Sequence, residues 1–254
     1  MLITCKNVSF GYEGRAIIKN LNFAVEPGDY LWVVGENGSG KTTLISGLLG
    51  LLSPLEGSIT FSNELGRGKI GYLSQQAELK KDFPAGVFEV VLSGNLSGMG
   101  LRPFYNAIEK ERAEDAMDLL GIKDLKKKCY RELSGGQQRR ILLARAFCAA
   151  QINPTGKNNK TSDMSSRLLV LDEPTSGLDP LITVEVYELL KTLNQQTGIS
   201  IIMVSHDTKG AESYAKHILQ MNYGQGFFAT TADYLNSDMG KKFFGGERSK
   251  TNAT

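Results

Sequence analysis

Long hydrophobic segments are missing from the 254-residue sequence. A membrane-spanning helix needs about eighteen or more consecutive apolar residues. The two best candidates, residues 44–52 and 141–150, are too short, and Arg145 interrupts the second. The first residues alternate as in a β-strand and lack the pattern of a signal peptide. We therefore expect a chain that does not cross the membrane itself, so that any work at a membrane needs a separate anchor.

Cysteine and net charge are also scarce. The three cysteines, Cys5, Cys129 and Cys148, are too few and too scattered for a disulfide framework, which favours a reducing compartment and a role as small buried hydrophobic side chains. Lys and Arg together number 29 against 27 acidic residues, so no basic excess indicates nucleic acid as a partner. The hydrophobic content of 41% is enough for a sizeable core.

What the sequence does contain is a glycine-rich segment of the form G-x-x-x-x-G-K-T. A buried strand is predicted before it, at residues 30–34, and an apolar helix after it, at residues 42–52. Glycines let backbone N–H groups wrap a triphosphate at a helix N-terminus, where the helix dipole favours negative charge. The Lys then lies between the β- and γ-phosphates and the Thr hydroxyl binds Mg²⁺. The segment consists of Gly35, Glu36, Asn37, Gly38, Ser39, Gly40, Lys41 and Thr42, with Thr43 next.

Two further strands are predicted to end in polar side chains. The uninterrupted apolar residues 168–171 are typical of a central parallel strand, and Asp172 and Glu173 follow them. Ligands of open α/β sheets bind at the carboxyl ends of strands, and two adjacent buried carboxylates need a compensating cation such as nucleotide-bound Mg²⁺. A second buried strand, residues 200–204, ends close to His206. The other histidine, His217, is predicted to be structural.

The remaining segments alternate between strand and helix patterns. One helix pattern has its apolar side at Ile108, Met117, Leu119 and Leu120, and the charged residues 109–112 are expected to form a solvated face. Helical patterns between residues 88 and 127 indicate a helical insertion between two parts of an α/β sheet. Strands are predicted at residues 2–10, 17–25, 57–61, 69–73, 218–221 and 226–229, and helices at 88–92, 107–120, 123–127, 138–150, 181–196 and 231–244.

A second candidate anion-binding segment is Leu133, Ser134, Gly135, Gly136 and Gln137. Ser134 precedes a predicted helix and is a typical N-cap residue, so this helix start is able to attract an anion. Composition alone predicts only a capped helix with a flexible entry. The polar residues 151–167 that come after the helix lack apolar periodicity and predict a surface loop.

Taken together, these motifs resemble the nucleotide-binding subunit of ATP-binding-cassette (ABC) transporters over nearly the whole chain. The motifs occur in the order of that family. They are the glycine-rich segment 35–42, called the P-loop, a glutamine after a strand, the segment 133–137, the strand followed by Asp172 and Glu173, and His206. The resemblance implies an α/β P-loop NTPase fold with a central, mostly parallel sheet and an N-terminal antiparallel β subdomain. It implies an ATPase domain at 1–245, with an inserted helical subdomain at about 76–150, a surface loop at 151–167 and a polar tail at 246–254.

The resemblance also implies roles within one chain for a Mg²⁺-dependent ATPase. Lys41 and the loop amides would hold the phosphates of ATP. Gln75 would sense Mg²⁺, although Gln76 is a rival because Ser74 stands where the family often has proline. Tyr12 would stack on adenine, and Thr42 would bind Mg²⁺ with support from Asp172. Glu173 would be the general base that activates the attacking water, and His206 would contact the γ-phosphate.

A complete site of this kind takes two chains. The segment Ser134, Gly135, Gly136 and Gln137 resembles the signature that contacts ATP bound to the other subunit, and Asp179 would lie at the dimer seam. The implied partners are a second copy of the chain or a paired ATPase subunit, and an integral membrane permease. Importers of this type also use an extracytoplasmic solute-binding protein. The implied location is cytoplasmic, on the inner face of the cell membrane.

The transported solute is indicated by one short segment. Asp82, Phe83 and Pro84, followed by Val87 and the residues at 89–91, resemble importers of zinc, manganese or iron chelates. Other small-solute importers share most of the remaining sequence. The loop 151–167 is longer than is usual in the family. The alternative is a soluble ABC ATPase that moves no solute, such as one that serves iron–sulfur cluster assembly.

Overall fold

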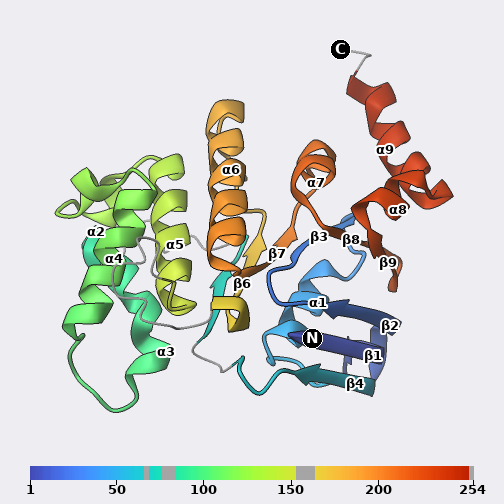
Figure 1. The fold of residues 1–254 in the computed structure, drawn as a ribbon, viewed down its shortest axis with the longest axis horizontal. Coiled ribbons are helices and arrows are strands. Elements are labelled where there is room, and N and C mark those ends of the chain that lie inside the picture. The colour runs from blue at the N-terminus through green and yellow to red at the C-terminus, as the bar shows by residue number, and fades with distance from the viewer. Residues whose placement is uncertain (66–68, 76–83, 153–163, 252–254) are drawn as a thin grey trace. The chain divides into compact units, whose positions relative to one another are not determined.

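The fold comes from a computed structural model (Figure 1), which describes residues 1–65, 69–75, 84–152 and 164–251, with side chains through residue 244. The chain forms two compact units, residues 1–61 with 202–254, and residues 62–201. The division falls inside strand β7 (Ser200–Val204). None of the described helices combines the length and the apolar character that crossing a membrane requires. Gln76, Asp82, Phe83 and most of the loop 151–167 lie outside the described residues.

The first unit contains an antiparallel sheet with the strand order β2-β1-β4. Ile3 on the middle strand pairs with Val25 on one side and with Phe61 on the other. Buried side chains such as Val8 and Phe10 point into the core from β1. This is the predicted N-terminal antiparallel β subdomain. Its strands are β1 (Ile3–Tyr12), β2 (Arg15–Val25) and β4 (Glu56–Phe61).

The same unit also contains a mixed arrangement of strands in the order β7-β3-β8-β9, to which β7 contributes residues 202–204. Strand β3 pairs with β8 in parallel and β8 pairs with β9 antiparallel. Every residue of β3 is buried, as the apolar pattern predicts. These strands are β3 (Tyr30–Gly35), β8 (His217–Asn222) and β9 (Gln225–Thr230).

His217 has a structural environment, in agreement with its prediction. Its Nδ1 forms a hydrogen bond of 2.8 Å with the carboxylate of the buried Asp29. The imidazole also stacks on the ring of Phe228, with 5.2 Å between ring centroids. His217 therefore ties the start of β8 to the turn before β3 and to β9.

The helices of the first unit are α1 (Lys41–Leu48), α7 (Thr208–Tyr214), α8 (Thr231–Asn236) and α9 (Asp238–Thr251). The single helix predicted at residues 231–244 is in fact two helices, because Ser237 adopts an extended backbone between α8 and α9. The sequence pattern predicts that the helix ends at residue 244, but α9 continues to Thr251. Tyr234 of α8 packs against Phe244 of α9, with 5.8 Å between ring centroids.

The second unit contains the strands β5 (Ile70–Leu73), β6 (Leu168–Asp172) and the first residues of β7, in the order β5-β6-β7. Strand β5 pairs with β6 in parallel, with Leu73 opposite Leu171. All five residues of β6 are buried, as expected of a strand that is covered on both faces.

The second unit is rich in helices, and α2, α4 and α5 lie side by side within it (Figure 1). The α-helices are α2 (Val87–Leu92), α3 (Leu96–Met99), α4 (Ala107–Leu119), α5 (Gly135–Ala149) and α6 (Pro180–Thr197). The unit also contains the short 3₁₀ turns η2 (Ser93–Asn95), η3 (Lys123–Leu125), η4 (Tyr130–Glu132) and η5 (Met164–Ser166), the last of which precedes β6.

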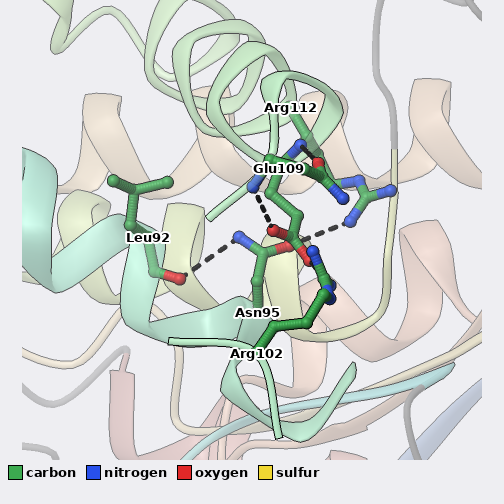
Figure 2. A network of polar contacts seen from close by, with 6 residues as sticks. Leu92, Asn95, Arg102, Glu109 and Arg112 are labelled. Atoms are coloured by element: carbon green, nitrogen blue, oxygen red, sulfur yellow. Dashed lines mark hydrogen bonds and ion pairs between the residues drawn. The ribbon is translucent and has the colours of Figure 1, made fainter. Parts of the chain in front are cut away.

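The prediction of a solvated charged face on α4 is wrong for Glu109, which is only 6% exposed, whereas the predicted apolar residue Ile108 is exposed. Glu109 Oε1 accepts a hydrogen bond from Arg102 Nη2 at 2.8 Å, and Glu109 Oε2 accepts one from the Asn106 N–H at 2.7 Å (Figure 2). Burial acts to raise the pKa of Glu109, but these hydrogen bonds and the charges of Arg102 and Arg112 lower it overall. The carboxylate is therefore buried because it has partners from outside its own helix.

Arg112 extends the same polar network toward α2. Its Nη1 donates to Asn95 Oδ1 at 2.9 Å, and Asn95 Nδ2 donates to the carbonyl oxygen of Leu92 at 3.2 Å (Figure 2). The buried polar groups thus fasten α4 to the end of α2 by directional bonds in addition to apolar packing.

Two of the three cysteines behave as predicted. Cys5 and Cys148 are buried, and burial raises the pKa of each thiol to about 12, so that both are protonated at neutral pH. Cys129 is partly exposed.

Candidate active site

The P-loop of the first unit connects β3, which ends at Gly35, to α1, which begins at Lys41. Gly35, Gly38 and Gly40 have φ angles of 151°, 81° and 103°, which residues with a Cβ rarely adopt. A Cβ on Gly35 would lie 2.4 Å from the carbonyl oxygen of Met221. The glycines therefore make a backbone turn that other residues would prevent.

The start of α1 fits a polyanion. Its N-cap, Gly40, offers no side-chain hydrogen bond, and no acidic residue lies in the first turn. Lys41 Nζ donates to the carbonyl oxygens of Gly35 at 2.6 Å and Glu36 at 2.8 Å, which places the ammonium group over the loop. The buried Ser39 Oγ has no hydrogen-bond partner among the described residues. Backbone donors, an ammonium and an unsatisfied hydroxyl together suit phosphate oxygens.

The other predicted nucleotide contacts of this unit lie at the loop and at the end of β1. Glu36, Asn37 and Thr42 are exposed, whereas Thr43 is buried. Tyr12, at the end of β1, is 49% exposed, which leaves a ring face accessible for stacking on a purine.

His206 follows the strand adjacent to β3. Strand β7 neighbours β3, and the N–H of Ser205 donates to the carbonyl oxygen of Val33 at 3.3 Å. His206 is exposed directly after this contact, and Asp207 then caps α7 by accepting from the Gly210 N–H at 3.0 Å. The first unit thus places the P-loop and His206 after adjacent strands.

In the second unit, Gln75 and Glu173 occupy equivalent positions just after the paired strands β5 and β6. Because Leu73 pairs with Leu171, each of the two residues lies two positions beyond a paired residue. Asp172 is only 7% exposed at the end of β6, and Glu173 is partly exposed with a φ of 48°. The strand pairing therefore brings the predicted metal-sensing glutamine and the predicted base to one edge.

The negative charge of Asp172 also affects a neighbouring side chain. Burial raises the pKa of Tyr72 on β5, and the charge of Asp172 raises it further. Tyr72 therefore remains a neutral phenol at neutral pH.

The sequence pattern missed Arg139, which is 9% exposed in α5. Its Nε donates to Pro174 O at 3.0 Å, its Nη1 to Ser74 O at 3.1 Å, and its Nη2 to Asp172 O at 2.8 Å and also to Glu173 O. Burial lowers the pKa of Arg139, while Asp172 and Glu173 act to raise it. Nothing in the sequence distinguishes Arg139 from its neighbour Arg140.

The predicted N-cap at Ser134 is confirmed. Ser134 Oγ accepts from the Gln137 N–H and Gln137 Oε1 accepts from the Ser134 N–H, which is a capping box. Ser134 and Gly135 are exposed, and a Cβ on Gly135 would meet no heavy atom within 4 Å. Asp179 caps α6 by accepting from the Ile182 N–H at 3.0 Å.

The ligand chemistry is compatible with Mg²⁺. Magnesium in nucleotide sites takes one or two protein oxygen ligands and completes its shell with phosphates and water. Carboxylate, hydroxyl and amide oxygens such as those of Asp172, Thr42 and Gln75 are suitable donors. In the part of the chain that the structure describes, no three His, Cys, Asp or Glu side chains gather into a metal cage.

Comparison with known proteins decides the family. The sequence matches the ABC transporter family over residues 18–152. The chain belongs to this family. The resemblance seen in the sequence is therefore confirmed. The strands observed in both units are also those that the resemblance implies.

Curated relatives with similar sequences are named as ATP-binding proteins of zinc or manganese transport and uptake systems. The Listeria innocua protein named zinc uptake system ATP-binding protein ZurA is 34% identical over 227 residues, which cover 87% of this chain and 82% of the relative. The zinc transport system ATP-binding protein AdcC of Streptococcus pneumoniae is 33% identical over 84% of this chain and 86% of its own. The manganese transport system ATP-binding protein MntB of Bacillus subtilis is 30% identical over 94% of this chain and 91% of its own.

A solved ABC structure agrees with these relatives. A metal-chelate type ABC transporter in an inward-facing conformation matches with a TM-score of 0.80 and 29% identity, over 96% of this chain and 88% of the matched chain. The prediction of the metal-ion or metal-chelate branch therefore agrees with both the sequence and the structure comparisons.

Proposed function

We propose that this chain is the Mg²⁺-dependent ATP-hydrolysing subunit of a transporter that imports a metal ion or metal chelate through a separate membrane permease. The observation that carries the proposal is the P-loop, in which Lys41 and the unsatisfied Ser39 Oγ lie at the uncapped start of α1. The zinc and manganese transport relatives, which this chain matches over most of their length, supply the solute class.

The nucleotide is held by the first unit in this proposal. Gly35, Gly38 and Gly40 allow the backbone to surround the phosphates, Lys41 neutralises their charge and Tyr12 stacks on the adenine ring. When ATP arrives, its phosphate oxygens replace the carbonyl oxygens of Gly35 and Glu36 as partners of the Lys41 ammonium. Glu36, Asn37, Ser39 and Thr43 complete the loop, and Thr42 supplies a hydroxyl ligand to Mg²⁺.

Hydrolysis depends on polar residues that follow strands. Glu173 orients and deprotonates the attacking water, Asp172 and Gln75 support Mg²⁺, and His206 contacts the γ-phosphate. Mg²⁺ supplies charge neutralisation of the phosphates when it is bound. The family's phosphoryl transfer relies on positioning and electrostatics, for which charged side chains at strand ends are suited.

The signature segment acts on a second nucleotide. Ser134, Gly135, Gly136 and Gln137 form an exposed helix start that is suited to contact the ATP of a partner subunit, and Asp179 lies at the seam of that dimer. ATP binding then closes a dimer of two such chains, or of this chain and a paired ATPase subunit, and hydrolysis releases it. This cycle moves a membrane permease, with the chain on its cytoplasmic side and an extracytoplasmic solute-binding protein delivering the metal.

Two measurements test the proposal. Purified protein is expected to hydrolyse ATP in the presence of Mg²⁺, and hydrolysis is expected to stop when EDTA removes the ion. Affinity purification of the tagged chain from detergent-solubilised membranes is expected to recover a polytopic membrane protein. A purely soluble partner would instead favour the alternative of an ATPase that serves iron–sulfur cluster assembly.

The solute is tested in cells. Deletion of the gene is expected to lower uptake of radioactive zinc or manganese, and wild-type protein should restore it. The matched control is Glu173→Gln, which should be expressed at the same level without restoring uptake. Unchanged uptake of both metals after deletion would remove the metal-import part of the proposal while leaving the ATPase part intact.

A further inference from the structure

We propose that Arg139 is a positioning residue for ATP hydrolysis, which fixes the backbone at Glu173 and before Gln75 and links both to the helix that carries the signature segment. This inference rests on the proposed ATPase function and adds a residue that the motifs do not include. It starts from the four main-chain carbonyl groups that the Arg139 guanidinium contacts.

The hydrogen bonds of Arg139 join three segments of the second unit. Arg139 lies on α5, Ser74 follows β5, and residues 172–174 end β6 and begin the turn after it. A guanidinium is planar and presents five N–H groups in a fixed fork, so that several bonds from one group define a geometry. A Lys ammonium at the same place would be a point charge without this fork.

The bonds act directly on the backbone of Glu173. The carbonyl of Asp172 belongs to the peptide group before the Glu173 Cα, and the carbonyl of Glu173 belongs to the peptide group after it. Nη2 of Arg139 donates to both oxygens. Arg139 therefore holds the two peptide planes whose orientation sets φ and ψ of Glu173.

Glu173 needs such support because its backbone is unfavourable. Its φ of 48° lies in the left-handed region, which is unfavourable for a residue with a Cβ. Without Arg139, the turn after β6 is free to relax toward a right-handed conformation. The carboxylate would then point elsewhere, which matters because a displacement of about 1 Å can cost 100-fold in rate.

The same guanidinium reaches the Gln75 segment. Ser74 O, which accepts from Nη1 at 3.1 Å, belongs to the peptide group that leads into Gln75. Arg139 also lies only five residues after Ser134, near the start of α5. A displacement of the start of α5 when the signature segment binds nucleotide would therefore be transmitted to both Gln75 and Glu173.

Steady-state ATPase kinetics of Arg139→Lys and Arg139→Ala test the proposal, with Arg131→Lys as the matched control. Arg131 is an exposed arginine of the turn η4, three residues before Ser134. Both Arg139 variants should lose about tenfold to 100-fold in kcat, because the base is misplaced. KM for ATP should stay within about twofold, since the P-loop is untouched. Arg131→Lys should match wild type.

Chemical rescue separates positioning from a general loss of structure. Millimolar guanidinium ion should raise kcat of Arg139→Ala, because the free ion can occupy the vacated position, and methylammonium at the same concentration should not. Thermal unfolding of every variant checks folding, and Arg139→Lys provides the test if Arg139→Ala does not fold.

Two results would overturn the inference. One is a kcat of Arg139→Lys equal to that of Arg131→Lys. The other is a loss of kcat that follows the fraction of unfolded protein and shows no rescue by guanidinium. If wild type is active and either result is found, only the role of Arg139 is ruled out. If wild type is inactive, the proposed ATPase function is ruled out as well.

Discussion

Ser134 and Gln137 cap the start of helix α5 reciprocally: Ser134 Oγ accepts from the Gln137 N–H at 3.3 Å, and Gln137 Oε1 accepts from the Ser134 N–H at 3.1 Å. The two side chains satisfy each other's backbone donors while Gly135 between them remains exposed. The chain's own hydrogen bonds therefore order the signature segment without any partner.

This arrangement predicts complementation between two inactive variants. Lys41→Ala removes the phosphate contact, and Gly135→Asp places a negative charge where the partner's triphosphate should approach. Gly135→Asp should fold, because space is free around Gly135 and an acidic residue in the first turn favours a helix. Mixed before ATP is added, the two variants should show an ATPase rate above the mean of their separate rates, since a mixed dimer contains one intact site.

The control for this prediction is the ATPase rate of each variant alone, measured at the same total protein concentration. A mixture that never exceeds the mean of the two separate rates would show that the signature segment does not act on a partner's nucleotide.

Glu173 is expected to be essential for turnover but not for binding. Glu173→Gln keeps the size of the side chain and removes the base, so kcat should fall by about 100-fold or more. ATP affinity, measured by fluorescence with a labelled nucleotide, should remain near that of wild type, and the ATP-bound dimer should accumulate on size-exclusion chromatography. Glu185→Gln on α6 is the control, because Glu185 is an exposed carboxylate. Equal kcat values for wild type and Glu173→Gln would remove the assignment of the base.

Two glycines of the P-loop should differ in their effect on stability. Gly35→Ala forces a Cβ to within 2.4 Å of Met221 O and should cost about 1–3 kcal/mol in unfolding free energy. Gly38→Ala finds open space and carries only the strain of its positive φ, about 1 kcal/mol. Both should weaken ATP binding, as measured by calorimetry. A larger fall in Tm for Gly38→Ala than for Gly35→Ala would contradict this account.

Tyr12 should contribute to affinity rather than to rate. Stacking between a base and an aromatic ring is worth about 1–3 kcal/mol, so Tyr12→Ala should weaken ATP binding about fivefold or more. Tyr12→Phe keeps the ring and should bind like wild type. Because Tyr12 is 49% exposed, the Tm of both variants should change little. Unchanged affinity in Tyr12→Ala would exclude adenine stacking.

The elements with strong local signals could be predicted from the sequence. The P-loop turn is set by its glycines, the start of α5 by the Ser134 and Gln137 cap, and β6 by an uninterrupted apolar run. Each of these depends on residues within a few positions of one another, so the pattern contains the cause. Together with the order of the motifs, they were enough to identify the family.

The tertiary structure alone decided which polar groups are buried and what they contact. Arg112 lies in a charged segment that looks solvated, yet its Nη1 donates to Asn95 Oδ1, 17 positions earlier in the chain. Arg139 looks like any helix arginine, yet its partners are carbonyl groups as far as 65 positions away in the chain. Burial of a charge depends on whether distant segments bring it partners, and the local sequence contains no record of which segments meet.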